Sequence, residues 1–179
     1  MVLYKRGAKL MYFDKISFEQ WVKDSPFINI PHNTLLRQYY NIQLPNQGTE
    51  DSMGLDFYMP YDLKILAHNK VKIPTGVRWI CDEENDDSYG MLIIPRSSIG
   101  IKLGLKLLNT IGIIDADYYL AENEGHIMLF MENTTDEDIT LKAGQGIVQG
   151  IIVPYVVPKH STSNTLRHGG FGSTDDNKK

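Results

Sequence analysis

The stretch "NTIGIIDADY", residues 109–118, carries groups that can do acid–base chemistry. Asp115 follows two isoleucines that would partly desolvate it, and in an extended hairpin it would share a face with Asp117. A carboxylate in that setting can act as a general base for water, and Tyr118 can pack against a sugar or a base. The alternative is a β-turn that uses aspartates for turn geometry, and these residues alone do not decide between the two.

A second stretch, "PRSS" at residues 95–98, places Arg96, Ser97 and Ser98 just after an apolar run. A turn into a helix at this point would offer free backbone amides beside the arginine, and this combination suits an anion. The alternative is a capped helix start with a surface arginine.

The third stretch, "RHGGFGST" at residues 167–174, lies close to the C-terminus. Its glycines allow the backbone to approach a ligand closely, and Phe171 can stack on a base. Phosphate oxygens are suitable partners for Arg167, Ser173 and Thr174. The alternative is a disordered tail, although such tails seldom hold an aromatic residue between glycines. We therefore expect an arm that closes over a bound molecule.

Composition limits the classes of function. The chain has 179 residues and a formal net charge of -4, which argues against a general nucleic-acid binder, because such proteins need an extended basic face. Its one cysteine, Cys81, allows no internal disulfide, which fits a reducing cytoplasm. No apolar run reaches the roughly 18 residues of a membrane-spanning helix. The histidines show no paired ligand spacing, so a zinc site is not expected.

The elements that must position these groups are mostly strands. Residues 16–24, "ISFEQWVKD", predict a short helix with Ser17 as its N-cap, and "SSIGIKLGLKLL" is the only other candidate helix. From residue 38 onward, short apolar runs between prolines and glycines predict strands, with clear alternation in "GHIMLFMEN" and "DEDITLKAGQ". The carboxylates of residues 82–87 predict a solvated hairpin tip, because they lack the spacing of a calcium loop. The pattern indicates an all-β sandwich, jelly roll or barrel.

Taken together and in order, five motifs resemble those of the trimeric deoxyuridine triphosphatase (dUTPase) family. "MGLDFYMP", with Gly54 and Asp56, is similar to the first motif, and "PRSS" to the second. "NTIGIIDADY", "GQGIVQ" at residues 144–149 and "RHGGFGST" resemble the third, fourth and fifth. The similarity extends over residues 38–179.

This resemblance implies an all-β subunit with a jelly-roll-like dUTPase β-barrel and one or two short helices. It implies a division into an N-terminal extension (1–37), a β core (38–158) and a flexible C-terminal arm (159–179). It also implies a homotrimer with active sites at the subunit interfaces. The protein would work in the cytoplasm, or in a host cytoplasm if it is phage-encoded.

The activity implied by the resemblance is hydrolysis of dUTP to dUMP and pyrophosphate, which limits uracil in DNA and supplies dUMP. Asp115 would deprotonate the water that attacks the α-phosphorus, and Mg²⁺ held mainly by the triphosphate would offset charge, with Asp56 acting on it through water. The residues implied to bind substrate are Arg96, Ser97, Ser98, Asn109, Gly112, Ile114, Tyr118, Gln149, Arg167, Phe171, Gly172, Ser173 and Thr174.

Two alternatives stay open. The dCTP deaminases resemble this fold and carry a similar "RSS" motif, but Phe130 stands where their deaminating glutamate would be, and Glu132 lies two residues further along. A regulatory binding protein on a dUTPase scaffold would use the extension and two loop insertions, one of which is the enlarged loop after Tyr118. The sequence also departs from the family at Gly146, where an arginine is common.

Overall fold

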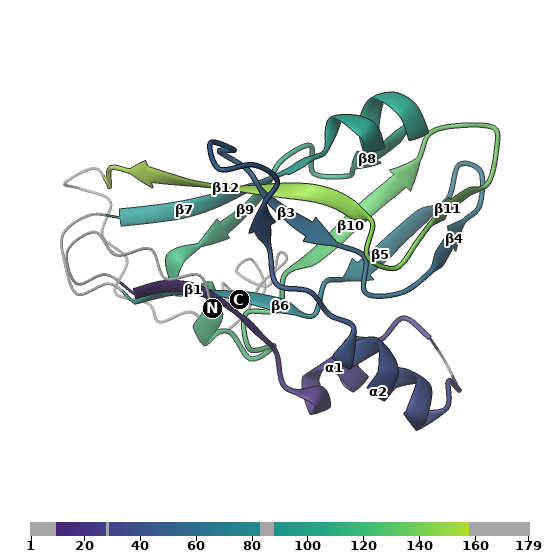
Figure 1. Cartoon of the computed structure of the whole chain (residues 1–179), viewed down its shortest axis with the longest axis horizontal. Helices are drawn as coiled ribbons and strands as arrows, with labels where there is room; N and C mark the ends of the chain where they lie inside the picture. The colour runs from purple at the N-terminus through teal and green to yellow at the C-terminus, as the bar shows by residue number, and fades with distance from the viewer. Residues whose placement is uncertain (1–9, 28, 83–87, 158–179) are drawn as a thin grey trace, which may run out of the picture.

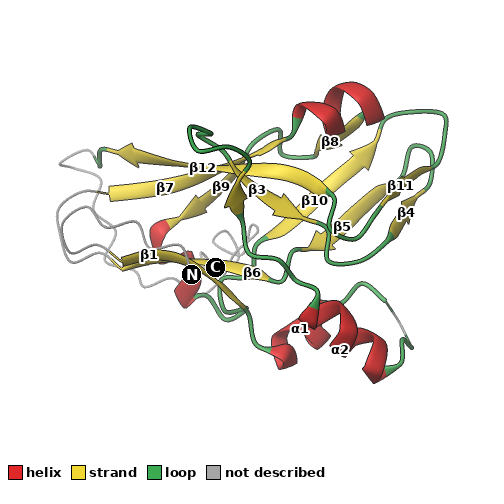
Figure 2. Cartoon of the chain, viewed as in Figure 1, coloured by secondary structure: helices red, strands yellow, loops and turns green. Residues whose placement is uncertain are grey.

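The computed structural model describes residues 10–27, 29–82 and 88–157, and it consists mainly of antiparallel strands (Figures 1 and 2). The strands are β1 (Leu10–Lys15), β2 (Asn46–Gln47), β3 (Leu55–Tyr58), β4 (Leu63–Ile65), β5 (Lys70–Pro74), β6 (Val77–Asp82), β7 (Ser88–Pro95), β8 (Leu105–Leu107), β9 (Gly112–Asp115), β10 (Met128–Asn133), β11 (Ile139–Leu141) and β12 (Gly146–Tyr155). The helices are α1 (Phe18–Asp24), α2 (His32–Tyr40), the π-helical turn η1 (Ser98–Lys102) and the 3-10 helix η2 (Ala116–Leu120).

The largest sheet has the strand order β2-β3-β12-β7-β9. Strand β12 is central and pairs with β3 on one side and with β7 on the other. Residues 146–148 and Gly150 of β12 are buried, which fits the nearly continuous apolar run there, and exposure rises toward Tyr155. Strand β9 forms the edge of the sheet and pairs only with β7 among the described strands.

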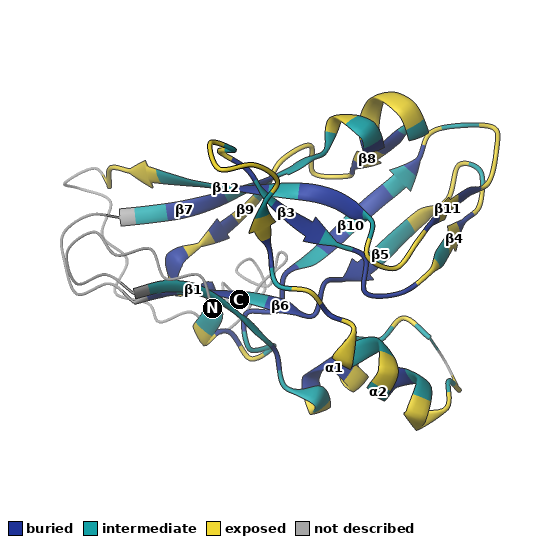
Figure 3. Cartoon of the chain, in the orientation of Figure 1, coloured by how far each residue is buried: buried dark blue, intermediate teal, exposed yellow. Residues whose placement is uncertain are grey.

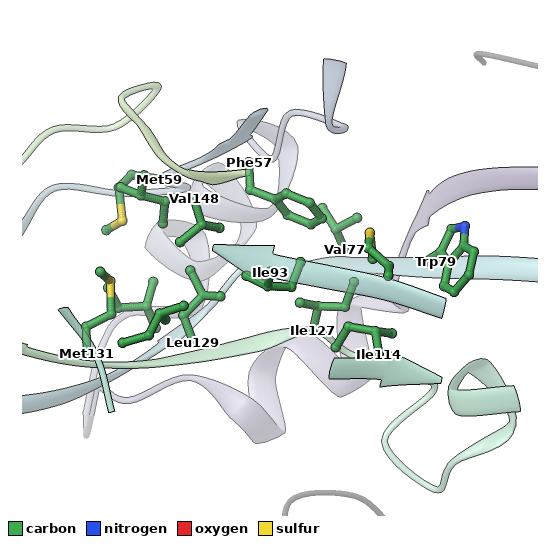
Figure 4. Close-up of a cluster of buried hydrophobic side chains, with 14 of the residues drawn as sticks. Phe57, Met59, Val77, Trp79, Ile93, Ile114, Ile127, Leu129, Met131 and Val148 are labelled. Atoms are coloured by element: carbon green, nitrogen blue, oxygen red, sulfur yellow. The ribbon is translucent and has the colours of Figure 1, made fainter. Parts of the chain in front are cut away.

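The remaining strands form the sheets β5-β10-β8, β1-β6 and β11-β4. Buried residues from these sheets and from the largest sheet form one hydrophobic cluster (Figures 3 and 4). The predicted alternation is confirmed, because Leu129 and Met131 of β10 and Ile139 and Leu141 of β11 are all buried. The all-β class is therefore confirmed.

The first predicted helix is also confirmed. Ser17 caps α1, and its Oγ accepts a hydrogen bond from the Gln20 N–H at 3.1 Å. Ile16 before the cap and Trp21 in the helix are both fully buried, which anchors the start of the helix in the core. The same N-terminal region contributes β1, which pairs with β6 over its whole length.

Helix α2 was not predicted. It begins after Pro31 without a side-chain cap, and Leu35 is its one buried residue. Contacts from elsewhere in the chain hold it: the Tyr39 hydroxyl donates to the Ile16 carbonyl at 2.8 Å, and the rings of Phe18 and Tyr39 lie 5.4 Å apart. The predicted boundary after residue 37 falls inside this helix, so the division into extension, core and arm stays a prediction.

The second candidate helix, "SSIGIKLGLKLL", is only partly correct. The π-helical turn η1 ends before Gly104, whose φ of +67° turns the chain, and residues 105–107 form strand β8.

The predicted hairpin with its tip at residues 82–87 is wrong, because the flanking strands β6 and β7 belong to different sheets and do not pair with each other. Residues 83–87 lie outside the described residues, and none of the described helices is long and apolar enough to cross a membrane.

Candidate active site

A pocket of about 310 Å³ opens beside strand β9. Its lining comes from β7, β8, the turn before β9, β9 itself, η2 and β10. The lining residues are Ile93, Leu107, Asn109, Ile111, Gly112, Ile113, Ile114, Asp115, Tyr118, Met128, Leu129 and Phe130. Most of these are apolar, as is typical of sites that enclose a flat organic group. The predicted residues Asn109, Gly112, Ile114, Asp115 and Tyr118 are thus brought together.

The turn before β9 is tightly constrained. Leu108 donates from its N–H to the Phe130 carbonyl at 2.9 Å, and Thr110 adopts a positive φ of 62°. Gly112 then follows at the start of β9, where an added Cβ would lie 3.1 Å from the Cβ of Ile93. A side chain at residue 112 would therefore require Ile93 to shift by a few tenths of an ångström, and this shift would change the wall of the pocket.

Asp115 and Tyr118 lie at the end of β9 and in η2. Asp115 is exposed and pairs in register with Gly90 of β7, whereas the preceding Ile114 is buried. Tyr118 is buried, and its hydroxyl donates to the His126 carbonyl at 3.1 Å and accepts from Asn123 Nδ2 at 2.9 Å. The expectation that Asp115 and Asp117 share a strand face is wrong, because Asp117 belongs to the 3-10 helix.

A second group of residues, which we call the Arg96 cluster, consists of the polar residues Asp56, Arg96 and Gln149 together with Gly146. Asp56 on β3 is buried, and its Oδ1 accepts from Gln149 Nε2 at 2.9 Å. Arg96 Nη2 lies 3.4 Å from Asp56 Oδ2, and a Cβ on Gly146 would overlap the Arg96 guanidinium. Because Gly146 has no side chain, the Arg96 guanidinium can occupy the space beside it.

Ser97 and Ser98 follow Arg96 at the start of η1, as the turn after the apolar strand predicted. Ser97 is exposed, and Ser98 is partly buried. The Arg96 N–H donates to the Ile147 carbonyl at 3.1 Å, which fixes the strand end from which both serines project. Residues Arg167, Phe171, Gly172, Ser173 and Thr174 lie outside the described residues.

Asp115 and the Arg96 cluster lie toward opposite ends of strand β7, whereas the pocket wall itself extends to Ile93, two residues before Pro95. Asp115 pairs with Gly90, and Arg96 directly follows Pro95 at the other end of the strand. Six residues of extended chain span roughly 20 Å. The described part of one chain therefore does not bring Asp115 and Arg96 to the same phosphate group.

Phe130 was not predicted as part of a substrate pocket, but it lines the cavity. The signal was present in the sequence, since Met128 and Phe130 are apolar on the face of β10 that alternation assigns away from the core. Glu132 on the same face does not line the pocket and forms an ion pair with Lys106 at 2.9 Å. The pocket thus lacks a carboxylate at the position that a deaminase of this fold would need.

Within the described residues, no group of three or more histidine, cysteine or carboxylate side chains is placed to hold a metal ion. Asp56 Oδ1 accepts a hydrogen bond from Gln149 and Oδ2 lies in an ion pair with Arg96, whereas a carboxylate can accept about four hydrogen bonds in total. This donor set fits a Mg²⁺ ion that takes most of its ligands from phosphate and water, because Mg²⁺ commonly keeps several waters in proteins.

Comparisons with known proteins agree with this arrangement. The dUTPase family model matches residues 40–175. The deoxyuridine 5'-triphosphate nucleotidohydrolase of Lactococcus lactis is 35% identical over 136 residues, which is 74% of this chain and 88% of that protein. The crystal structure of the dUTPase from Streptococcus mutans is 30% identical with a TM-score of 0.61, and the match covers 82% of this chain and 98% of that one.

A dUTPase from phage phi11 of S. aureus shares the fold at 18% identity and a TM-score of 0.55, over 70% of this chain and 92% of that one. The predicted jelly-roll-like fold is thereby confirmed. The match of the family model and the identity to the Lactococcus lactis protein cover most of the chain. This chain belongs to the dUTPase family.

Proposed function

We propose that this chain is a nucleotide pyrophosphohydrolase that converts dUTP to dUMP and pyrophosphate, and so limits uracil in DNA and supplies dUMP. The observation that carries the proposal is the pocket, which combines an apolar lining, a strand edge and the Asp115 carboxylate at the end of that strand. These features suit a pyrimidine base with a phosphate chain leading away from it. The family membership established above supports the same substrate.

The base would enter beside β9. As an edge strand, β9 presents backbone N–H and C=O groups of the kind that pair with the edge of a base. Asn109 and the backbone of Gly112 and Ile114 would read the uracil in this way. Tyr118 would lie against the deoxyribose and leave no room for a 2'-hydroxyl.

Asp115 would accept a proton from the attacking water as the water oxygen bonds to the α-phosphorus. The bond from that phosphorus to the bridging oxygen breaks, and pyrophosphate leaves with the electron pair. The exposed position of Asp115 leaves room for a phosphate and a water beside it. Catalysis of this type depends on positioning and charge compensation more than on covalent chemistry.

Magnesium would accompany the substrate. The dUTPase from phage phi11 is described as coordinating a structural Mg(II) ion. In this chain, Asp56 would hold the ion through water, and the triphosphate would supply the other ligands. The bound ion would offset the negative charge that develops on the phosphate oxygens. Arg96, Ser97, Ser98 and Gln149 would bind the same phosphates directly.

The distance along β7 supports an active site shared between two copies of the chain, and the resemblance to trimeric dUTPases makes the assembly a homotrimer. Since roughly 20 Å of strand separates Asp115 from Arg96, one substrate would use the pocket of one copy and the Arg96 cluster of another. The C-terminal arm (159–179) would then close over the site, with Phe171 on the uracil and Arg167, Gly172, Ser173 and Thr174 at the phosphates. The cytoplasmic location and the absence of nucleic-acid binding stay predictions from the sequence.

The activity is tested by measuring pyrophosphate release from dUTP, dCTP, dTTP and UTP in the presence of Mg²⁺. We expect rapid turnover of dUTP alone. Release of ammonia from dCTP would instead support a deaminase. Binding of dUTP without turnover of any nucleotide would support the binding-protein alternative.

The interface site is tested by refolding an equal mixture of Asp115→Asn and Arg96→Ala chains. If each site combines halves from two copies, about a quarter of the sites in randomly mixed trimers contain both native residues. At dUTP concentrations well below the native KM, where both variants are nearly inactive, activity should therefore rise well above that of either variant alone. A mixture that stays as inactive as its components would place both residues in sites formed by one chain.

A further inference from the structure

Two contacts join helix α1 to the loop that follows Tyr118, which we call the Tyr118 loop (residues 121–127). The first is at Glu124, whose carboxylate accepts hydrogen bonds from the Ser17 N–H at 2.7 Å and from Ser17 Oγ at 2.5 Å. Glu124 adopts a positive φ of 60°, which an ordinary side chain rarely does without support from its surroundings. The start of α1 thus holds the strained part of the loop.

The second contact is a fully buried histidine. His126 Nε2 accepts a hydrogen bond from the Gly76 N–H at 2.8 Å, so the ring proton sits on Nδ1. Nδ1 donates it to Asp24 Oδ2 at 2.6 Å, and that same carboxylate oxygen accepts from Gln20 Nε2 at 2.8 Å. The last residue of α1 therefore fixes the far end of the Tyr118 loop.

The loop in turn fixes Tyr118. The hydroxyl of Tyr118 bonds to the His126 carbonyl and to Asn123, both of which belong to the loop. Gly125, with a φ of +72°, lets the loop fold back so closely that an added Cβ would lie 2.5 Å from the Tyr119 Cα. A continuous path of contacts thus runs from α1 through the Tyr118 loop to one wall of the pocket.

We propose that this path is a brace that sets the selectivity of the pocket for deoxyribose over ribose, with Ser17, Asp24, Glu124 and His126 as positioning residues. The proposal rests on the proposed function, since it assumes that Tyr118 lies against the sugar. Excluding one hydroxyl by contact requires a wall that does not yield, and small displacements of a positioning group have large effects on reactive complexes. Loosening the brace should therefore admit UTP and weaken the binding of dUTP.

The test compares Asp24→Ala with Asp24→Asn. The asparagine can still accept the His126 and Gln20 hydrogen bonds through its side-chain oxygen, whereas alanine removes both. The control is Asp138→Ala, which removes a carboxylate that bonds Lys64 at 2.8 Å and the Ala67 N–H at 3.0 Å away from the pocket. The readouts are kcat and KM for dUTP and for UTP, binding of dUMP and UMP by calorimetry, and the thermal unfolding temperature of each variant.

For Asp24→Ala we expect the preference for dUTP over UTP to fall about tenfold, because KM for UTP falls and KM for dUTP rises, with kcat changed far less. Asp24→Asn and Asp138→Ala should stay close to the native preference. A native-like preference in Asp24→Ala, with only a lower unfolding temperature, would overturn the proposal and leave the contact a purely structural one.

If Asp24→Ala does not fold, the preference for dUTP over UTP is measured in Glu124→Gln and Ser17→Ala, where we expect a smaller fall. A native-like preference in both variants would equally overturn the proposal. The proposed function fails separately, because in that case the native chain itself would not hydrolyse dUTP.

Discussion

The pocket and the Arg96 cluster differ in the groups that form them. The pocket is lined mainly by apolar side chains and strand backbone, and Ile114 and Tyr118 in its wall are buried in the core. In the Arg96 cluster, the side chains of Arg96 and Gln149 both contact the carboxylate of Asp56, which is 5% exposed. The shape of the pocket thus follows from the packing of the fold, whereas the geometry of the cluster depends on its own hydrogen bonds and ion pair.

This difference indicates separate contributions to binding. A pocket fixed by packing is suited to selecting a base and a sugar by shape. A cluster of a guanidinium and an amide over a buried carboxylate is suited to holding phosphate, and it can adjust when the ligand arrives. Variants of the two regions should therefore change different kinetic constants.

The largest effect is expected for Asp115→Asn. Loss of a general base should lower kcat by about 10²- to 10⁴-fold. Since Asp115 is exposed at the end of β9, the unfolding temperature should change little. The matched control is Asp117→Asn, an exposed residue of η2 two positions along, which should retain activity. Single-turnover measurements with both variants would check this, and an active Asp115→Asn chain would refute the assigned base.

A smaller effect is expected for Arg96→Ala. Removing the guanidinium should raise KM for dUTP by about 10- to 100-fold, since charge-assisted bonds to phosphate are among the stronger polar contacts. Affinity for deoxyuridine, which has no phosphate, should stay the same. Calorimetry with dUTP and deoxyuridine would measure both, with Lys102→Ala as an exposed control in η1. Equal losses for the two ligands would show that the two regions do not divide the substrate as proposed.

The buried His126 behind the pocket predicts an effect of pH on stability. Burial lowers the pKa of His126 below its ordinary value of 6.5, although Asp24 and Glu124 favour its charged form, and nearby Lys72 lowers the pKa further. The unfolded chain therefore binds a proton near pH 6.5, and the native chain does so only at lower pH. The free energy of unfolding should fall as the pH drops below 6.5, by at most about 1.4 kcal/mol per pH unit.

Urea unfolding at pH 7.5, 6.5 and 5.5 would measure this effect. This pH range lies above the pKa values of ordinary carboxylates. Burial raises the pKa of Asp24, but hydrogen bonds from His126 and Gln20 outweigh that effect and lower it, so Asp24 stays ionised throughout the range. Asp24→Asn removes a negative charge that favours protonated His126, which lowers the native pKa of His126 further. In this variant, the free energy of unfolding should therefore keep falling down to a lower pH than in the native protein. A flat profile in the native protein would contradict the buried neutral histidine.

The smallest effect is expected for Gly146→Ala. The new Cβ would displace the end of the flexible Arg96 side chain, which is 36% exposed and can move. We expect a few-fold rise in KM for dUTP and little change in unfolding temperature, because no backbone has to shift. Gly100→Ala is the control, since its Cβ would meet only the Leu105 carbonyl at 3.9 Å. A large fall in stability would mean that Gly146 serves the strand rather than the guanidinium.

Features that depend on local pattern could be predicted from the sequence. The alternation in β10 and β11 and the Ser17 cap follow from side chains a few residues apart. The motif at residues 109–118 also predicts that Asn109, Asp115 and Tyr118 belong to one site, but the sequence does not predict the part of the lining that comes from β8 and β10, including Phe130.

Features that depend on distant partners could not be predicted. Helix α2 lacks a capping side chain and is held by Phe18 and Ile16, so its own residues carry little signal. The bonds of Glu124 to Ser17 and of His126 to Asp24 join residues 107 and 102 positions apart. No periodicity or turn pattern specifies such pairs, because they arise only when the sheets have assembled.

Strand β12 has a consequence for the synthesis of the protein. It is the last described strand, and it joins β3 to β7 at the centre of the largest sheet. A growing chain therefore cannot complete that sheet until residue 155 has left the ribosome, and before then the edges of β3 and β7 lack their common partner. Exposed strand edges of this kind favour association between unfinished chains. The yield of native protein should thus depend on how quickly the final third of the chain is translated and released.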